Sequence, residues 1–135
     1  MTPDEAATLL ESTFKLNWAN ATPVVWDNTV PPSPPTVWAR FTVRHGASRL
    51  RSWTGKTKTY TRAGYAFLQL YIPLGEGLKQ GRTLAQAARR IFEGKSFSGG
   101  LDCLTTDVEE VGNVADGDFQ INVSISFRYD EAVPG

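Results

Sequence analysis

The chain has 135 residues, of which 41% are hydrophobic and 21% charged, and its 14 basic and 14 acidic residues cancel at neutral pH. These values are close to globular averages, so they exclude a disordered chain and a disulfide scaffold and predict a single domain, residues 1–135. One cysteine and one histidine also exclude an internal disulfide and a Cys/His zinc site. The lone cysteine indicates a cytoplasmic folding environment. Because no apolar run approaches the roughly 20 residues that cross a bilayer, we expect no membrane partner.

The first segment has the pattern of an amphipathic helix. Thr2 is placed as the N-cap, Pro3 occupies the first helical position, and Glu5 completes a capping box. The apolar residues recur at helical spacing, which predicts a helix that ends near Asn20 and packs one face against a core. These apolar residues are Ala6, Leu10, Phe14 and Trp18.

Two strand patterns lie on either side of a proline-rich stretch. Pro23 and the prolines within 31–35 exclude a helix here, so we expect a short edge strand at about 24–28 and then an extended loop. Residues 37–45 alternate between apolar and polar side chains. This alternation is typical of a strand with one buried face.

The segment from about 46 to 63 is polar, basic and rich in threonine, with Gly55 and Lys56 as a possible turn. A long two-stranded arm and a mobile loop fit this pattern equally well. Residues 65–72 form instead a continuous apolar run. That run predicts a central strand covered on both faces, by helices or by a neighbouring subunit.

A second helix is predicted by apolar positions on one face and by Gly94, a C-cap glycine preceded by two arginines. Its start is ambiguous, since Thr83 could cap it while it could equally begin near Leu78. Two further strands are expected at about 102–111 and 119–129, joined by a turn. Together the elements predict an α+β domain with an antiparallel or mixed sheet of about four to six strands and two main helices packed on it.

The sequence contains no convincing catalytic, cofactor or metal motif. Gly75 and Gly77 follow a strand, but the third glycine of a dinucleotide-binding loop is not at the required spacing. Residues 94–96 resemble the end of a phosphate-binding loop, yet they follow a helix instead of leading into one. His45 has no serine or cysteine near it in a nucleophile context. We therefore expect no enzyme, no cofactor and no metal site.

Charge is sorted along the chain even though the total is zero. Between Arg44 and Arg62 there are six basic residues and no acid, whereas between Asp102 and Glu131 there are eight acids and one arginine. The basic stretch could be a solvated hairpin, or it could bind nucleic acid through phosphate contacts and base stacking. In a ring of identical subunits it could instead meet the acidic surface of the next copy. The candidate assembly residues are Arg49, Arg51, Trp53, Lys56, Lys58 and Tyr60 in the basic stretch and Asp107, Glu109 and Glu110 in the acidic one.

The order of these features resembles the tail terminator family of long-tailed phages. The resemblance covers nearly the whole chain and rests on order and spacing, since no single motif is diagnostic. It starts with the amphipathic helix that ends in Phe14 and Trp18. It continues through Pro23 to Asn28, Trp38-Ala39-Arg40, Gly64 to Gln69, Arg90 to Phe97 and Gln120 to Val123.

This resemblance implies a structural subunit that forms a hexameric ring on the last ring of the tail tube, at the head-proximal end of the virion tail. Such a ring would stop tube growth and offer its other face to the head-tail connector, and its channel would allow weak, sequence-independent contact with passing DNA. The partners would be further copies of the chain, the tail tube protein and the connector. The alternatives are another phage neck protein, for head closure or tail completion, and a small nucleic-acid-binding module.

Overall fold

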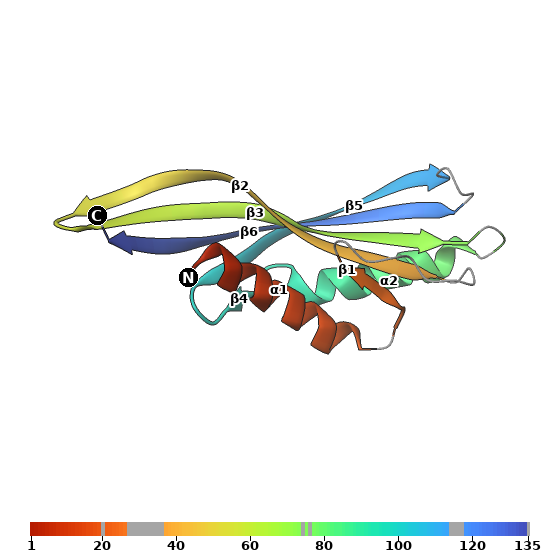
Figure 1. Ribbon diagram of the computed structural model, residues 1–135. Helices are drawn as coiled ribbons and strands as arrows, with labels where there is room; N and C mark the ends of the chain where they lie inside the picture. Colours follow the sequence, from red (N-terminus) through yellow and green to blue (C-terminus); the bar gives the residue numbers. More distant parts are fainter. Residues whose placement is uncertain (20, 27–36, 74, 76, 114–117, 135) are drawn as a thin grey trace.

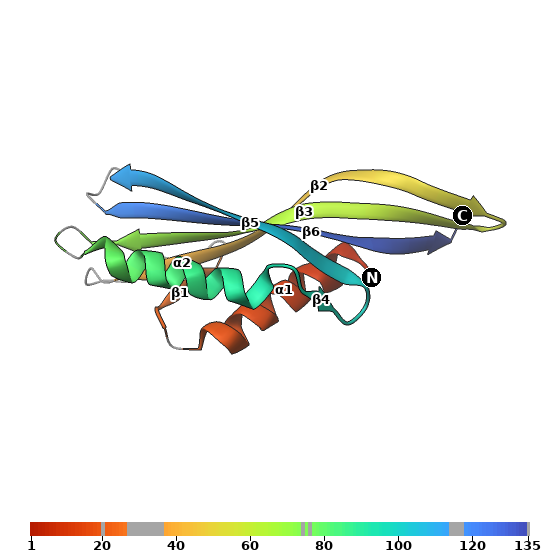
Figure 2. The ribbon, with the colours of Figure 1, turned by 180° about the vertical axis from the view of Figure 1, so that it is seen from behind.

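The structure is a computed structural model that describes residues 1–19, 21–26, 37–73, 75, 77–113 and 118–134. Within these residues the chain forms two helices and one six-stranded sheet, and both helices lie on the same side of the sheet (Figures 1 and 2). The predicted α+β class is therefore confirmed. The elements are α1 (Pro3–Trp18), β1 (Val24–Trp26), β2 (Trp38–Thr54), β3 (Thr57–Ile72), α2 (Leu78–Phe92), β4 (Ser96–Phe97), β5 (Leu101–Asn113) and β6 (Phe119–Pro134).

The sheet has the strand order β1-β2-β3-β6-β5-β4. It is mixed, because β1 runs parallel to β2 while the other neighbouring strands are antiparallel. Strands β2, β3 and β6 continue well past the helices (Figure 1). We call this extension the arm; it comprises residues 46–63 of the β2–β3 hairpin and residues 129–134 of β6. The β4 strand was not predicted from the sequence.

Residues 46–63 form the two-stranded arm that was one of the two predicted alternatives, with its turn at Gly55 and Lys56. The mobile-loop alternative is wrong, and a third strand that was not predicted pairs with the arm. Its third strand is the end of β6, where Tyr129 lies opposite Arg62 and Pro134 lies opposite Thr57. The alternation of apolar and polar residues that predicted β6 stops after Tyr129. Hydrogen bonding to β3 continues beyond that point, because an exposed strand needs a paired backbone but no apolar face.

The capping box of α1 forms as predicted. The Glu5 amide donates to the Thr2 hydroxyl oxygen at 3.2 Å, and the Thr2 amide donates to the Glu5 carboxylate at 3.3 Å. The helix ends at Trp18, close to the predicted end at Asn20, which itself lies outside the described residues. These bonds satisfy amides that the first turn of a helix leaves without partners.

The second helix takes the earlier of its two possible starts. It begins at Leu78, and Thr83 lies inside it, with its hydroxyl donating to the Lys79 carbonyl oxygen at 2.9 Å. Gly81 brings the helix close to the sheet, since an added Cβ would overlap Ile72 and lie 2.9 Å from the Ile121 Cδ1 atom. A glycine inside a helix therefore serves packing here.

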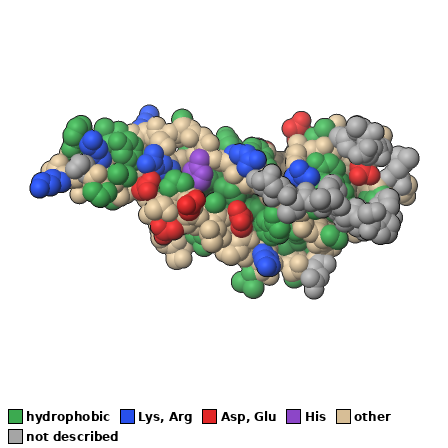
Figure 3. Space-filling view, in the orientation of Figure 1, with side chains coloured by type: hydrophobic (Ala, Val, Ile, Leu, Met, Phe, Trp, Pro, Cys, Tyr) green, Lys and Arg blue, Asp and Glu red, His purple; other side chains and the backbone are tan. Residues whose placement is uncertain are grey.

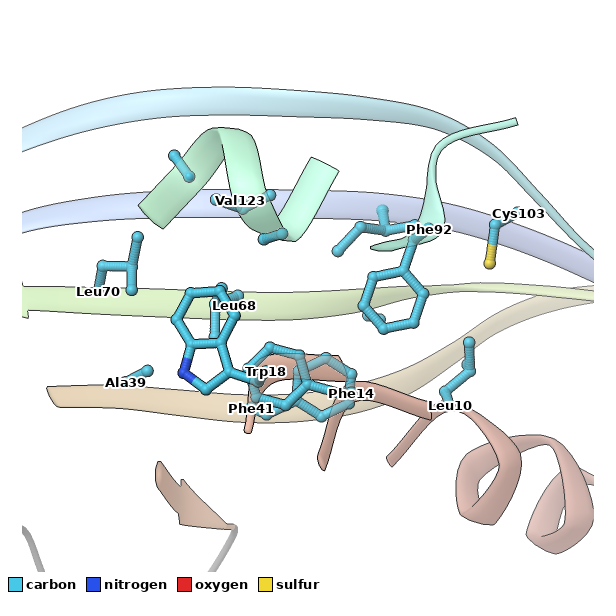
Figure 4. Close-up of a cluster of buried hydrophobic side chains, with 14 of the residues drawn as sticks. Leu10, Phe14, Trp18, Ala39, Phe41, Leu68, Leu70, Phe92, Cys103 and Val123 are labelled. Atoms are coloured by element: carbon cyan, nitrogen blue, oxygen red, sulfur yellow. The ribbon is translucent and has the colours of Figure 1, made fainter. Parts of the chain in front are cut away.

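The core lies between the helices and the sheet and is centred on stacked aromatic rings (Figure 4). The Phe14 ring is fully buried and stacks on Phe41 of β2 at a centroid distance of 4.5 Å and on Trp18 at 5.0 Å. Phe92 at the end of α2 is parallel to Phe41 at 6.0 Å. One aromatic cluster thus joins both helices to the sheet.

The far face of the sheet, which we call the open face, has no helix over it among the described residues. The prediction that residues 65–72 are covered on both faces by helices is therefore wrong. Ala66 and Leu68 of β3 are fully buried under the helices, whereas Tyr65 on the open face is exposed and Phe67 is half-buried. The apolar run reflects stacking between these two rings, at 5.7 Å. Cover by a neighbouring subunit stays a prediction.

Replacing Phe14 by alanine should lower the free energy of unfolding by about 3–5 kcal/mol, because the substitution leaves a cavity in the aromatic cluster. The control is Leu16→Ala on the same helix, where the side chain is 81% exposed and the expected change is within about 0.5 kcal/mol. Chemical denaturation of both variants measures the difference. Equal stability of the two variants would contradict the assigned core.

A second prediction concerns the point where the body meets the arm. A Cβ added to Gly64 would overlap the Arg44 carbonyl oxygen and lie 2.8 Å from the Phe127 ring, so Gly64→Ala should destabilise the protein by about 1–3 kcal/mol. The matched control is Gly46→Ala, whose added Cβ would meet its nearest atom at an ordinary 3.7 Å. Thermal unfolding compares the two, and a Gly64→Ala protein as stable as the control would argue against this close contact.

Candidate assembly surfaces

The arm carries apolar and basic side chains together on its helix-side face. Side chains alternate along a strand, so Tyr60 and Lys58 point to the same side of β3 as the buried Leu68. Across β2, Leu50 lies opposite Tyr60 and Trp53 lies opposite Lys58. Leu50 and Trp53 are 48% and 64% exposed, because the helices end before they reach this part of the sheet. The Lys58 ammonium lies 4.1 Å from the centre of the Trp53 ring, a cation–π contact.

The opposite face of the arm, which continues the open face, is polar. Arg49 lies opposite Thr61, whose hydroxyl donates to the Asp130 carboxylate at 2.9 Å. The Arg51 guanidinium forms an ion pair with the same carboxylate. With Arg128 and Asp102, these side chains line a shallow hollow beside the arm. Lys56 is exposed in the turn at the tip, and basic and hydrophobic side chains gather there (Figure 3).

The arm is less basic than its sequence segment indicates. In the sequence, Asp130 and Glu131 belong to the acidic segment, but pairing of β6 with β3 places them in the arm. Asp130 pairs with Arg51, and Glu131 pairs with Arg62 at 2.9 Å. A predicted β6 strand that extended to Pro134, the next residue typical of a turn, would have placed both acids beside the basic residues of the arm. The separation of a basic arm from an acidic surface therefore applies to Asp107, Glu109 and Glu110 of β5, but not to Asp102, Asp130 or Glu131.

The predicted acids of β5 divide between the two faces of the sheet. Asp107 and Glu109 share the open face, since Val108 between them lies opposite Val123, which is buried under the helices. Glu110 lies on the helix side and accepts a hydrogen bond from the Arg82 Nε atom of α2 at 2.6 Å. This hydrogen bond lowers the pKa of Glu110. The structure thus places Asp107 and Glu109 together and ties Glu110 to α2.

Two strand edges have no partner among the described residues, a feature that sequence reasoning missed. Strand β1 covers only Ala39, Arg40 and Phe41 of β2, so residues 46–54 have a free outer edge. Strand β4 covers only Leu101 and Asp102 of β5. The Gly94 amide donates to the Leu104 carbonyl oxygen, and the Glu93 carboxylate accepts from the Thr106 amide, so the free edge of β5 comprises residues 107–113. Unpaired strand edges are ready templates for pairing with another chain.

The free edges differ in charge and lie at opposite ends of the sheet (Figure 1). The β5 edge exposes acids with apolar side chains between them, and Val108 is 40% exposed. The β2 edge exposes Arg49 and Arg51 around Leu50. Because the two edges are separated by the length of the body, the β2 edge can meet a β5 edge only on another copy of the chain.

The single histidine and the single cysteine contribute to the packing and hydrogen bonding of the fold. The His45 ring nitrogen Nε2 lies 2.7 Å from the Tyr129 hydroxyl, and burial together with the nearby Arg62 lowers the pKa of His45. Burial raises the pKa of the Cys103 thiol to about 12, so it stays protonated at neutral pH. No group of three His, Cys, Asp or Glu side chains that could hold a metal occurs in the described parts of the chain. No described helix is long and apolar enough to cross a membrane.

Comparison with known proteins identifies the family. A family model described as phage tail terminator protein matches residues 6–129. One solved structure shares the fold, with a TM-score of 0.62 and 22% identity over 91% of this chain and 94% of that chain. No curated protein matches at a significant level. Since the family match spans nearly the whole chain, the chain belongs to the phage tail terminator family.

Proposed function

We propose that this protein forms a hexameric ring that caps the phage tail tube, ends tube polymerisation and joins the tail to the head-tail connector. Membership of the tail terminator family gives it a structural role in the phage tail. The observation that carries the finer proposal is the pair of unlike free edges: one basic, on β2, and one acidic, on β5. The proposed place of assembly is the host cytoplasm, and the proposed role requires no catalysis and no cofactor.

Unlike edges on one subunit favour a ring. Identical subunits that join through two different surfaces form a heterologous interface, which closes into a ring when the rotation between neighbours permits it. Each copy then offers its free basic edge to one neighbour and its free acidic edge to the other. Opposite charges also steer the two surfaces together and disfavour contact between like edges.

The capping role requires the two faces of the ring to differ. A tail tube grows because each added ring offers an acceptor surface for the next one. A terminator has to match the tube on one side and lack that acceptor surface on the other. The unlike faces of the subunit support this proposal, since both helices lie on one face of the sheet and no helix of the described residues lies over the open face (Figure 2). The proposed partners are the tail tube protein and the connector.

The nucleic-acid reading is less well supported by the arm. Base stacking needs a free aromatic face, but Lys58 lies over the Trp53 ring and Arg62 lies 4.8 Å from the centre of the Tyr60 ring. Asp130 also takes up the charge of Arg51. We therefore propose only weak, non-specific contact with DNA in the ring channel. A monomer that binds random oligonucleotides tightly and releases them in salt would favour the nucleic-acid reading.

A phage without this protein should make tails of abnormal length that are not joined to filled heads, because nothing then ends tube growth or completes the joining surface. Electron microscopy of lysates measures tail length and attachment, with complementation by the intact gene as the control. Unjoined tails of normal length would instead favour a different neck role, such as head closure. Normal tails on filled heads would refute every neck role.

The double variant Arg49→Glu with Arg51→Glu should weaken association of the subunits by at least about tenfold at low salt, because like charges then face each other. The matched control is Lys79→Glu with Arg90→Glu, which makes the same charge change on exposed positions of α2. Sedimentation at low and high salt, for the free protein and for protein bound to tail tubes, measures association. Unchanged association of the arm variant at both salt concentrations would contradict a role for these arginines.

A further inference from the structure

We propose that the free β2 edge of one copy pairs with the free β5 edge of the next copy, so that the sheet continues from subunit to subunit. The occupant of each edge is thus a second copy of this chain. This inference rests on the proposed function only in assuming that copies associate. Backbone pairing of this kind supplies affinity, while alternate side chains supply specificity.

The strand directions suit this pairing. Strand β2 is antiparallel to β3, β3 to β6, and β6 to β5, so β2 and β5 of one chain run in opposite directions. If the next copy is added in the same orientation, its β2 therefore meets β5 as an antiparallel neighbour. The continued sheet keeps the helices of both copies on the same side, and an antiparallel ladder is the slightly more stable kind.

On both faces of the sheet, the side chains of β2 in one copy would complement those of β5 in the next. On the helix side, Leu50 and Trp53 of the arm would meet Val108 of β5, all of them exposed in the single subunit. On the open face, Arg49 and Arg51 would meet Asp107 and Glu109. Apolar side chains then cover one another on one face while opposite charges pair on the other. A shift by one residue would bring charged side chains against apolar ones on both faces.

One register satisfies both faces. With Leu50 opposite Val108, Arg49 lies opposite Glu109 and Arg51 comes next to Asp107. Val108 lies in a regular stretch of β5, between the β-bulges at Cys103/Thr106 and Glu110/Gly112, whereas Leu50 borders the β-bulge of β2 at Leu50/Ser52. Cross-strand pairs of opposite charge or of apolar side chains each contribute roughly 0.2–1 kcal/mol.

The free stretch of β5 is the shorter of the two. Residues 46–54 span about 30 Å and residues 107–113 span about 24 Å at roughly 3.4 Å per residue. In this register, His45 of the arriving copy falls opposite Asn113 of the receiving copy, and the body of the arriving copy lies beyond that point. The helical layers of successive copies therefore follow one another along the strand direction, and the arm of each copy lies beside the body of its neighbour.

Cysteine cross-linking between two variants tests the contact. A Leu50→Cys chain is mixed with a Val108→Cys chain and oxidised, both free and bound to tail tubes. Neighbouring side chains in an antiparallel pair lie within disulfide reach, so the mixture should give a covalent dimer that neither variant gives alone. The parent chain is the blank, because Cys103 is buried. The control mixture pairs Leu50→Cys with Leu16→Cys on the outer side of α1 and should give no dimer.

A chain that carries both Leu50→Cys and Val108→Cys should give a ladder of linked copies that ends at the ring size. Association without the 50–108 link, or with a 50–50 link instead, would overturn the edge pairing and leave the capping role standing. A protein that stays monomeric in solution and on tail tubes would overturn both. The experiment therefore distinguishes failure of the edge pairing from failure of the proposed ring.

A charge exchange tests the register without introducing cysteine. Arg49→Glu should weaken association by about tenfold, and adding Glu109→Arg in the same chain should restore most of it, because the pair is then reversed. Adding Glu11→Arg on α1 instead restores the net charge but should not restore association. Rescue by both second substitutions, or by neither, would contradict the proposed pairing of Arg49 with Glu109.

Discussion

The backbone pairing of β3 holds the architecture together. This strand pairs with β2 on one side from Thr57 to Tyr71 and with β6 on the other side from Thr57 to Ile72. Because these ladders run further than the helices, the same strands form the floor of the core at one end and the arm at the other. Their outer edges stay open where β1 and β4 stop. The body, the arm and the candidate assembly edges therefore all follow from the unequal lengths of neighbouring strands.

The side chains of the arm contribute little to the stability of the fold. They form instead a surface on which charged and apolar groups alternate. Exposed ion pairs such as Arg51 with Asp130 contribute only about 0–1 kcal/mol each, and the apolar groups of Leu50 and Trp53 are largely exposed. The acids of β6 offset part of the basic charge, so the arm is a mixed surface of charged and apolar groups. Such a surface suits a protein partner with a matching pattern better than it suits a uniformly charged polyanion.

Local patterns in the sequence were sufficient to predict the body of the fold. The capping box at Thr2, the apolar stripe that includes Phe14, and the alternation of β6 up to Tyr129 are short-range signals with a known period. The third strand of the arm could not be predicted in this way, because residues 130–134 have no apolar face and are held by pairing to a distant segment. Tyr65 and Phe67 led to the wrong prediction that helices cover both faces of β3. Their rings stack on each other, and no helix of the described residues covers them.

The sequence predicted which charged residues belong to the candidate assembly surfaces, but it did not predict which of them are neighbours in space. Sorting of charge along the chain located the basic arm and the acids of β5, but only the register shows that Asp130 belongs to the arm and that Glu110 is bound to Arg82. The free strand edges cannot be predicted from a single sequence, because they depend on where a neighbouring strand ends. Exposed apolar residues between charges, such as Leu50 and Val108, were the signal available.

The proposed ring requires subunits that join head to tail through two different edges. High-resolution imaging of the assembled particle, alone or at the neck of the virion, tests this most directly, because it reveals both the symmetry and the contacting strands. The account predicts a closed cyclic ring in which the arm of each subunit lies along β5 of its neighbour. A two-fold dimer joined through like edges, or a ring in which both edges face solvent, would contradict it.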